Sequence, residues 1–182
     1  MNQSLGMVEL NTVSSGISAA DMMLKTAHVE ILISETVCPG KYIVLIAGIL
    51  SAVTAAVDAA KAAYEAHLID SFILGNPHGS IFPALYGSTA IESIDALGII
   101  ETYSAPSMIT AADAAAKTAI VDLIEIRLCK GMCGKSYTIL TGEVSAVEAA
   151  IDHAKSAIAD TGLFLDSAVI PHPDPGLYKS IL

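Results

Sequence analysis

The sequence has no long apolar run and few charged residues, and each shortage excludes a class of protein. Its most apolar stretch, residues 42–57, is interrupted by Gly48, Ser51 and Thr54, whereas a membrane-spanning helix needs roughly 20 apolar residues in a row. Charged residues make up 15% of the chain and hydrophobic residues 53%, which is not typical of a disordered chain. We therefore expect an ordered protein without a membrane-spanning segment.

Basic residues are also scarce. Nine Lys and Arg stand against nineteen Asp and Glu, for a net charge of −10, and the basic residues form no cluster. Because an acidic surface repels phosphate backbones, we expect no nucleic-acid partner. Residues 1–10 lack a basic segment followed by an apolar core, so we expect no secretion signal and predict a cytoplasmic protein.

The sequence motifs that accompany catalysis are missing as well. It contains no Gly-rich phosphate loop, no nucleophile elbow and no His-Glu metal motif. The five histidines are scattered, and paired acids such as Glu30 and Glu35 are expected to be solvated. We predict that the protein is not an enzyme.

An internal repeat, in contrast, covers nearly the whole chain. Gly6–Glu9 (Gly-Met-Val-Glu) returns 92 residues later as Gly98–Glu101 (Gly-Ile-Ile-Glu), and further matches follow in the same order. These are Ala19–Asp21 with Ala111–Asp113, Lys25–Ala27 with Lys117–Ala119, Ser51–Val53 with Ser145–Val147, Asp58 with Asp152, Lys61 with Lys155, Asp70 with Asp166, and His78 with His172. The sequence therefore predicts a tandem duplication, with domains at residues 1–90 and 91–182.

Each half predicts the element order βαββαβ, which is the split, ferredoxin-like arrangement of an α+β protein with both helices on one face of an antiparallel sheet. We expect Ser18 and Thr110 to cap the first helix of each half, and residues 81–85 to form a short helix between the halves. The strands are predicted at 6–10, 28–34, 42–47 and 68–74, then 98–102, 121–128, 137–141 and 163–170, and the second helices at 51–67 and 145–161.

The mean hydropathy of +0.61 is high for a chain without a membrane span. Surplus apolar surface of this kind indicates burial between subunits. A monomer with an alanine-rich core is the alternative.

The repeated motifs, Gly-x-x-Glu, Ala-Ala-Asp-x-x-x-Lys and Ser-Ala-Val, resemble the shell domain of bacterial microcompartments. Two copies in one chain resemble the tandem shell proteins, such as those of propanediol-utilisation compartments. The resemblance implies the βαββαβ fold and a homotrimer that forms a pseudo-hexameric ring with six lobes. It also implies tiling with other shell proteins into the compartment wall, and a central pore that passes small metabolites. A tandem ligand-binding regulatory protein with the same fold is the alternative.

The resemblance also implies roles for particular residues. Lys25 and Lys117 match the lysine at the tiling edge of the family, although an ordinary solvated helix lysine is the alternative. His78 and His172 stand where many relatives carry an edge arginine, and neutral histidine lacks the guanidinium's fork of donors. The pore is expected at the turns that join two strands in each half, namely Val37, Cys38, Pro39, Gly40 and Lys41, and then Gly131, Met132, Cys133, Gly134 and Lys135.

Three cysteines in a chain predicted to be cytoplasmic do not predict a disulfide framework. Cys38 and Cys133 fall in the pore turns, where three-fold symmetry would bring three thiolates together to bind an iron–sulfur cluster and pass electrons. Lys41 and Lys135 would favour the thiolates. In some tandem relatives the cluster cysteine lies near the start of the second half's first helix, where this chain has Met108. The alternative is that the cysteines are small apolar residues in turns.

Overall fold

The computed structural model describes residues 4–91 and 93–177 and contains the same series of elements twice. The first series is β1 (Ser4–Leu10), α1 (Val13–Thr26), β2 (Glu30–Val37), β3 (Lys41–Gly48), α2 (Leu50–Ala63), a 3₁₀ turn (Glu65–His67) and β4 (Leu68–Leu74). After α3 (Ile81–Leu85), the second is β5 (Ala96–Thr102), α4 (Ala105–Thr118), β6 (Val121–Arg127), β7 (Ser136–Gly142), α5 (Val144–Ala157), a 3₁₀ turn (Ala159–Thr161) and β8 (Phe164–Ile170).

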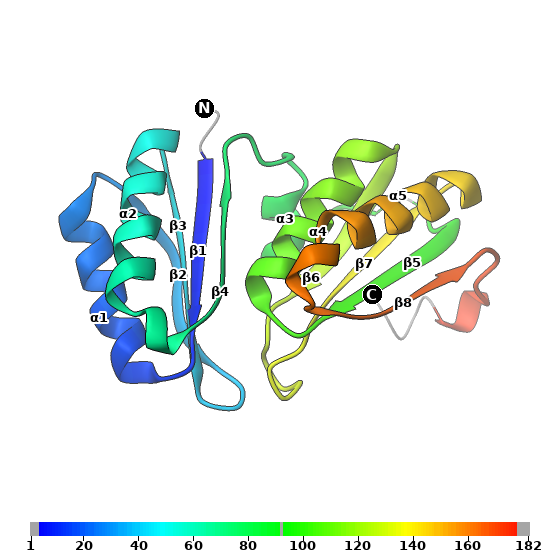
Figure 1. Ribbon diagram of the computed structural model, residues 1–182. Coiled ribbons are helices and arrows are strands. Elements are labelled where there is room, and N and C mark those ends of the chain that lie inside the picture. The colour runs from blue at the N-terminus through cyan, green and yellow to red at the C-terminus, as the bar shows by residue number, and fades with distance from the viewer. Residues whose placement is uncertain (1–3, 92, 178–182) are drawn as a thin grey trace. The chain divides into compact units, whose positions relative to one another are not determined.

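Each series forms its own antiparallel sheet, in the order β2-β3-β1-β4 and β6-β7-β5-β8. Helices α1 and α2 cover one face of the first sheet (Figure 1), and α5 packs on β5, β7 and β8 of the second. The predicted α+β class and the duplicated βαββαβ order are therefore confirmed.

The predicted start of the first helix was wrong in both halves. Helix α1 begins at Val13, where Thr12 is the cap and its Oγ1 accepts a hydrogen bond from the Ser15 amide, so Ser18 lies within the helix. Thr110 likewise lies inside α4. Gly16 lies inside α1 although glycine is unfavourable there, because a Cβ at this position would overlap Cβ and Cγ of Tyr42, so only glycine lets the strand approach the helix. The predicted strand at 68–74 and short helix at 81–85 are confirmed.

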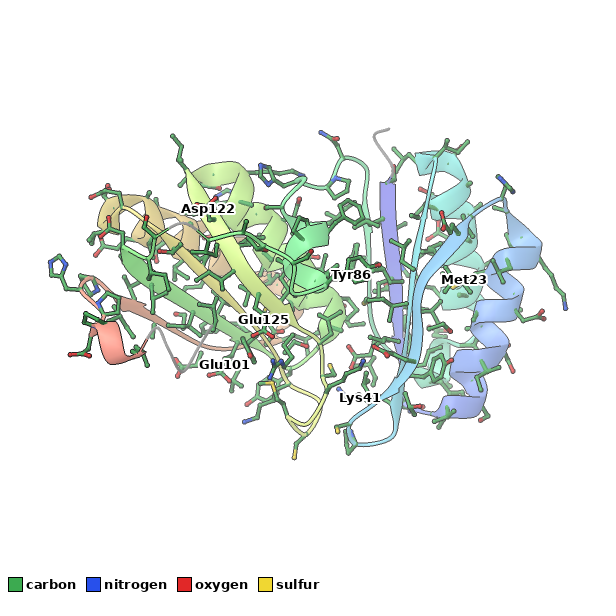
Figure 2. The ribbon with its side chains drawn as sticks, turned by 180° about the vertical axis from the view of Figure 1, so that it is seen from behind. Met23, Lys41, Tyr86, Glu101, Asp122 and Glu125 are labelled. Atoms are coloured by element: carbon green, nitrogen blue, oxygen red, sulfur yellow. The ribbon has the colours of Figure 1, made fainter. Side chains whose placement is uncertain are left out.

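The first core lies between the sheet and its two helices. Val8, Val44 and Ile46 from the strands pack with Met23 of α1 and Val57 of α2, and Met23 lies between α1 and the sheet (Figure 2). Burying side chains of this size contributes about 1.5–3 kcal/mol each. The strands and helices of the first half are thus held together by an apolar core.

The recurring glycine of β1 and β5 has a packing reason. A Cβ on Gly6 would lie 2.6 Å from Cγ1 of Val53, and one on Gly98 would lie 2.8 Å from Cγ1 of Val147. Because α2 and α5 approach their central strands this closely, each half requires a residue without a side chain at this point.

The contacts of the chain divide it into two compact units that do not coincide with the repeats. The first is Met1–Pro77 with Ser104–Ser107 and Leu128–Lys135, and the second is His78–Tyr103, Met108–Arg127 and Ser136–Leu182. The first unit therefore contains the first turn of α4 and both predicted pore turns. No helix within residues 4–91 and 93–177 is long and apolar enough to cross a membrane.

Candidate functional site

The two predicted pore turns lie against each other in the first unit. The Cys38 amide donates to the Cys129 carbonyl at 3.2 Å, and Lys130 Nζ lies 2.7 Å from Glu35 Oε2. An open groove of about 400 Å³ is lined by residues 36–40 of one turn and by Lys130 and Gly131 of the other. The structure thus brings together two segments that the sequence placed in separate halves.

Within these turns the predicted residues differ in exposure. Val37 and Gly134 are buried, while Pro39, Gly40 and Cys133 are exposed. Cys38, Lys41, Met132 and Lys135 are half-buried. Among the described residues, no group of three or more His, Cys, Asp or Glu is arranged to hold a metal ion. The predicted cluster draws one cysteine from each of three chains, so its site is a property of the assembly.

The second turn has a left-handed backbone at four residues. Two are glycines, Gly131 and Gly134, and two are cysteines, Cys129 with φ of 52° and Cys133 with φ of 53°. For a residue with a side chain this conformation costs roughly 1–2 kcal/mol. Cys129 is held there because its buried thiol donates to the Gly134 carbonyl at 3.3 Å. This third cysteine therefore has a structural contact that sequence reasoning did not predict.

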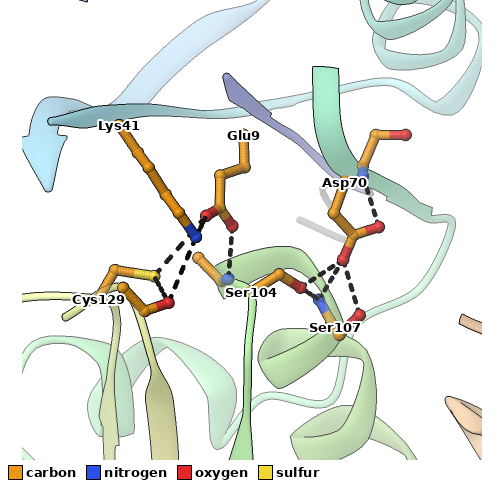
Figure 3. A network of polar contacts seen from close by, with 9 residues as sticks. Glu9, Lys41, Asp70, Ser104, Ser107 and Cys129 are labelled. Carbon is orange, nitrogen blue, oxygen red and sulfur yellow. Dashed lines mark hydrogen bonds and ion pairs between the residues drawn. The ribbon is translucent and has the colours of Figure 1, made fainter. Parts of the chain in front are cut away.

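A buried carboxylate at the end of β1 connects the turns to helix α4 (Figure 3). Glu9 is fully buried, its Oε1 lies 2.8 Å from Lys41 Nζ, and its Oε2 accepts the Ala105 amide at 2.7 Å. Burial raises the pKa of Glu9 above its ordinary value, while the hydrogen bond and charge of Lys41 and the Ala105 amide oppose the shift. The ammonium of Lys41, which we expected to favour a thiolate, forms this ion pair.

A second carboxylate binds the same helix start. Asp70 Oδ2 accepts hydrogen bonds from Ser104 Oγ at 2.5 Å, Ser107 Oγ at 2.7 Å and the Ser107 amide at 3.1 Å. Glu9 and Asp70 are paired residues on neighbouring strands, so both point to the first turn of α4. Negative charge is favourable there because the first amides of a helix have no partner within the helix. We call Glu9, Asp70, Ser104, Ala105 and Ser107 the α4 cradle.

The predicted edge lysines are exposed and paired within their own helices. Lys25 Nζ lies 2.6 Å from Asp21 Oδ2, and Lys117 Nζ lies 2.5 Å from Asp113 Oδ2. Such pairs contribute a few tenths of a kcal/mol, about 0.2–0.5. Asp113 also accepts the amide of His78 at 2.7 Å, so His78 contacts a helix through its backbone. His172 is exposed.

One further polar cluster, on β6 and β7, was not predicted. The Tyr137 hydroxyl donates to Glu125 Oε2 at 2.6 Å, Arg127 Nη2 lies 2.6 Å from Glu125 Oε1, and the guanidinium lies 5.5 Å from the Tyr137 ring centre. Burial and the bond to Glu125 raise the pKa of Tyr137 to about 12. The sequence signal for this cluster is a pair of opposite charges two residues apart on one strand, Glu125 and Arg127, with the aromatic Tyr137 on the neighbouring strand.

Known proteins with similar sequences and structures agree on one class. A family model described as "BMC domain" matches residues 4–77 and again 96–173. The bacterial microcompartment shell protein PduT of Citrobacter freundii is 35% identical, over 100% of this chain and 99% of that protein. The carboxysome assembly protein CcmO of Synechococcus elongatus is 29% identical, over 98% of this chain and 68% of that protein.

Two solved structures extend the agreement to the fold. The crystal structure of a microcompartments protein from Desulfitobacterium hafniense DCB has a TM-score of 0.86 at 45% identity, covering 98% of this chain and 99% of that one. The fused permuted hexameric shell protein MSM0275 from the RMM microcompartment has a TM-score of 0.65 at 25% identity, covering 87% and 82%.

Proposed function

The chain belongs to the BMC domain family and is a shell component of a bacterial microcompartment, and from this premise we propose that three copies close into a ring with six lobes around a pore. Proteins of this family oligomerise and assemble with other shell proteins. The observation that supports the ring best is the tandem match at 4–77 and 96–173, for which we propose domain boundaries at residues 1–90 and 91–182.

The surface of α1 supports association. Ile17 and Leu24 are about half exposed on this helix, and exposed apolar side chains of this size mark interaction surfaces when they gather on one element. A chain with two similar but unequal halves can join head to tail, and such interfaces form a closed ring when the rotation is right.

The mass in solution tests the ring. Sedimentation equilibrium or native mass spectrometry at micromolar concentration should give the mass of three chains. A monodisperse monomer or dimer would contradict the ring, and with it the proposed pore.

Tiling is the second part of the proposal. We place Lys25, Lys117, His78 and His172 at the edges where rings meet, and the exposure of all four residues supports this position. Replacing both lysines by glutamate should abolish sheets seen by electron microscopy while the trimer persists. The matched control is Lys61→Glu with Lys155→Glu, which makes the same charge change on the second helices. Sheets that survive the Lys25 and Lys117 changes would contradict this role, and equal loss of sheets in the control would show that the effect is not specific to these two lysines.

The pore is the third part. Residues 37–41 and 131–135 line it, it passes small metabolites, and the chain itself catalyses no reaction. An iron–sulfur cluster held by Cys38 or Cys133 from three chains would add electron transfer. Wild type, Cys38→Ser and Cys133→Ser should be reconstituted anaerobically with iron and sulfide and measured by absorption and paramagnetic resonance. Cys129→Ser is the control, because that thiol has a structural contact. A wild type that stays colourless after reconstitution would contradict the cluster, and the pore would then be a channel only.

A further inference from the structure

Every residue of the α4 cradle has a counterpart in the other repeat. Glu9 pairs with Asp70 across β1 and β4, and Glu101 pairs with Asp166 across β5 and β8, with an irregularity directly after the glutamate in both cases. At the helix start, the counterparts of Ser104, Ala105 and Ser107 are Thr12, Val13 and Ser15. The register therefore identifies a second set of the same five positions.

The two sets differ in their hydrogen bonds. At α4, the hydroxyls of Ser104 and Ser107 both donate to the Asp70 carboxylate. At α1, the hydroxyl of Thr12 donates instead to Ser15 Oγ at 2.9 Å, while Asp166 is exposed and Glu101 is half-buried. In both helices the cap oxygen accepts the amide three residues later, so α1 and α4 have the same local geometry for an incoming carboxylate.

We propose that a second copy of this chain completes the α1 set: Asp166 and Glu101 of one copy bind the first turn of α1 in the next, at Thr12, Val13 and Ser15. This inference rests on the proposed ring and assigns the residues of its interface. Asp166 would accept both hydroxyls and the Ser15 amide, and Glu101 would accept the Val13 amide. Each copy contributes the carboxylates on one side and the helix start on the other, as a head-to-tail ring requires.

A second pair of counterparts points to the same partner. Asp113 accepts the His78 amide and its side chain is 6% exposed, whereas the side chain of its counterpart Asp21 is 61% exposed. An open groove of about 430 Å³ beside Asp21 is lined by Ile17, Lys25 and Tyr64, among others. In the ring, the loop at His172 of the neighbouring copy lies in this groove, with its backbone amide on Asp21. In this interface, two contacts found within the chain repeat between copies: the carboxylate pair on a helix start, and a loop amide on a helix aspartate.

A charge exchange tests the pairing. Asp166→Lys places an ammonium at the helix start, and Ser15→Asp places a carboxylate opposite Asp166; each alone should weaken association at least about tenfold. The two changes in one chain put the new ammonium opposite the new carboxylate and should restore the ring. Asp160→Lys, an exposed position in the 3₁₀ turn before β8, is the matched control and should keep the wild-type mass. Sedimentation velocity over a range of concentrations measures all four, with circular dichroism to verify folding.

The outcomes separate the two proposals. A monomeric wild type contradicts both the ring and this interface. A trimeric wild type whose Asp166→Lys and Ser15→Asp variants associate as tightly as the control contradicts the interface and leaves the ring. Failure of the double variant to recover contradicts the pairing of these two positions. If a single charged variant does not fold, Asp166→Asn and Ser15→Ala are measured in the same way, and unchanged association of both also contradicts the interface.

Discussion

The starts of α1 and α4 have nearly the same sequence pattern but different surroundings. Ile17 of α1 is 55% exposed, while its counterpart Ile109 is fully buried; Asp21 is exposed, while Asp113 is buried. Because the local backbone and caps agree, the difference comes from what packs on each helix within the chain. The repeated sequence therefore produces the same helix surface twice, and what packs on that surface decides whether its side chains are buried.

The same comparison shows a size exchange beneath the helices. The first half combines Gly16 with the large Tyr42, and the second has Met108 and Ser136 at the corresponding positions. Close packing conserves total volume rather than the residue at either position. The residues at these two positions have thus diverged between the halves, while their combined volume stayed about the same.

The largest expected effect is a difference between Ile17 and Ile109, which occupy equivalent positions in α1 and α4. Ile109→Ala should lower the free energy of unfolding by about 2–5 kcal/mol, because it empties a buried site. Ile17→Ala should change it by less than about 1 kcal/mol in the dissociated chain, because that side chain is half exposed. Denaturant unfolding at low protein concentration measures both. Equal losses would show that α1 is as buried as α4 in the single chain.

The size exchange gives the next effect. Gly16→Ala should destabilise the chain by about 1–3 kcal/mol, since the new methyl group overlaps Tyr42. Adding Tyr42→Ser, which copies the second half, should recover part of the loss. Gly79→Ala is the control, because a Cβ there meets nothing within 4 Å. Thermal unfolding of these three variants and of Tyr42→Ser alone measures the coupling, and additive losses in the double variant would contradict the exchange.

The buried carboxylate of the α4 cradle predicts a pH effect. Because the pKa of Glu9 is raised in the folded state, the folded chain holds its proton at pH values where the unfolded chain has lost it. The contribution of Glu9 to the free energy of unfolding therefore falls as the pH rises from its ordinary pKa of 4.5 to its raised pKa in the folded chain. Glu9→Gln removes this dependence, so the difference between wild type and variant should slope over that window. A flat difference would contradict the raised pKa.

The smallest effect concerns the second helices. The Glu143 carboxylate caps α5, and the hydrogen bond from Ser145 lowers its pKa, whereas Ile49 gives α2 no side-chain cap. Glu143→Gln should slightly reduce stability at neutral pH, and this difference should vanish as pH falls through the lowered pKa. Ile49→Asp should add about 0.5–1 kcal/mol at neutral pH by capping α2. Thermal unfolding at pH 7 and pH 3 tests both substitutions; a loss of stability on Ile49→Asp would contradict the comparison.

Sequence reasoning succeeded where the signal is local or recurs. The repeat, the element order βαββαβ and the helix at 81–85 all follow from patterns within a few residues or from their recurrence. It failed at the start of the first helix in each half, where the groups that accept the early amides are Thr12 for α1 and, for α4, Ser104 together with Asp70 from a distant strand. The roles assigned to the pore turns and edge residues remain predictions about an assembly.

By itself, then, the sequence determined the duplicated α+β fold, because apolar spacing and turn residues act over short distances, and its repeated motifs indicated the family by resemblance. Only the tertiary structure decided that Glu9 is buried with Lys41, that Cys129 is a structural thiol, and that two carboxylates bind the start of α4. The Glu9 carboxylate and the Ala105 amide are 96 residues apart in sequence. No local pattern records such a pairing, because its free energy depends on the removal of both groups from water at a point that only the folded chain creates.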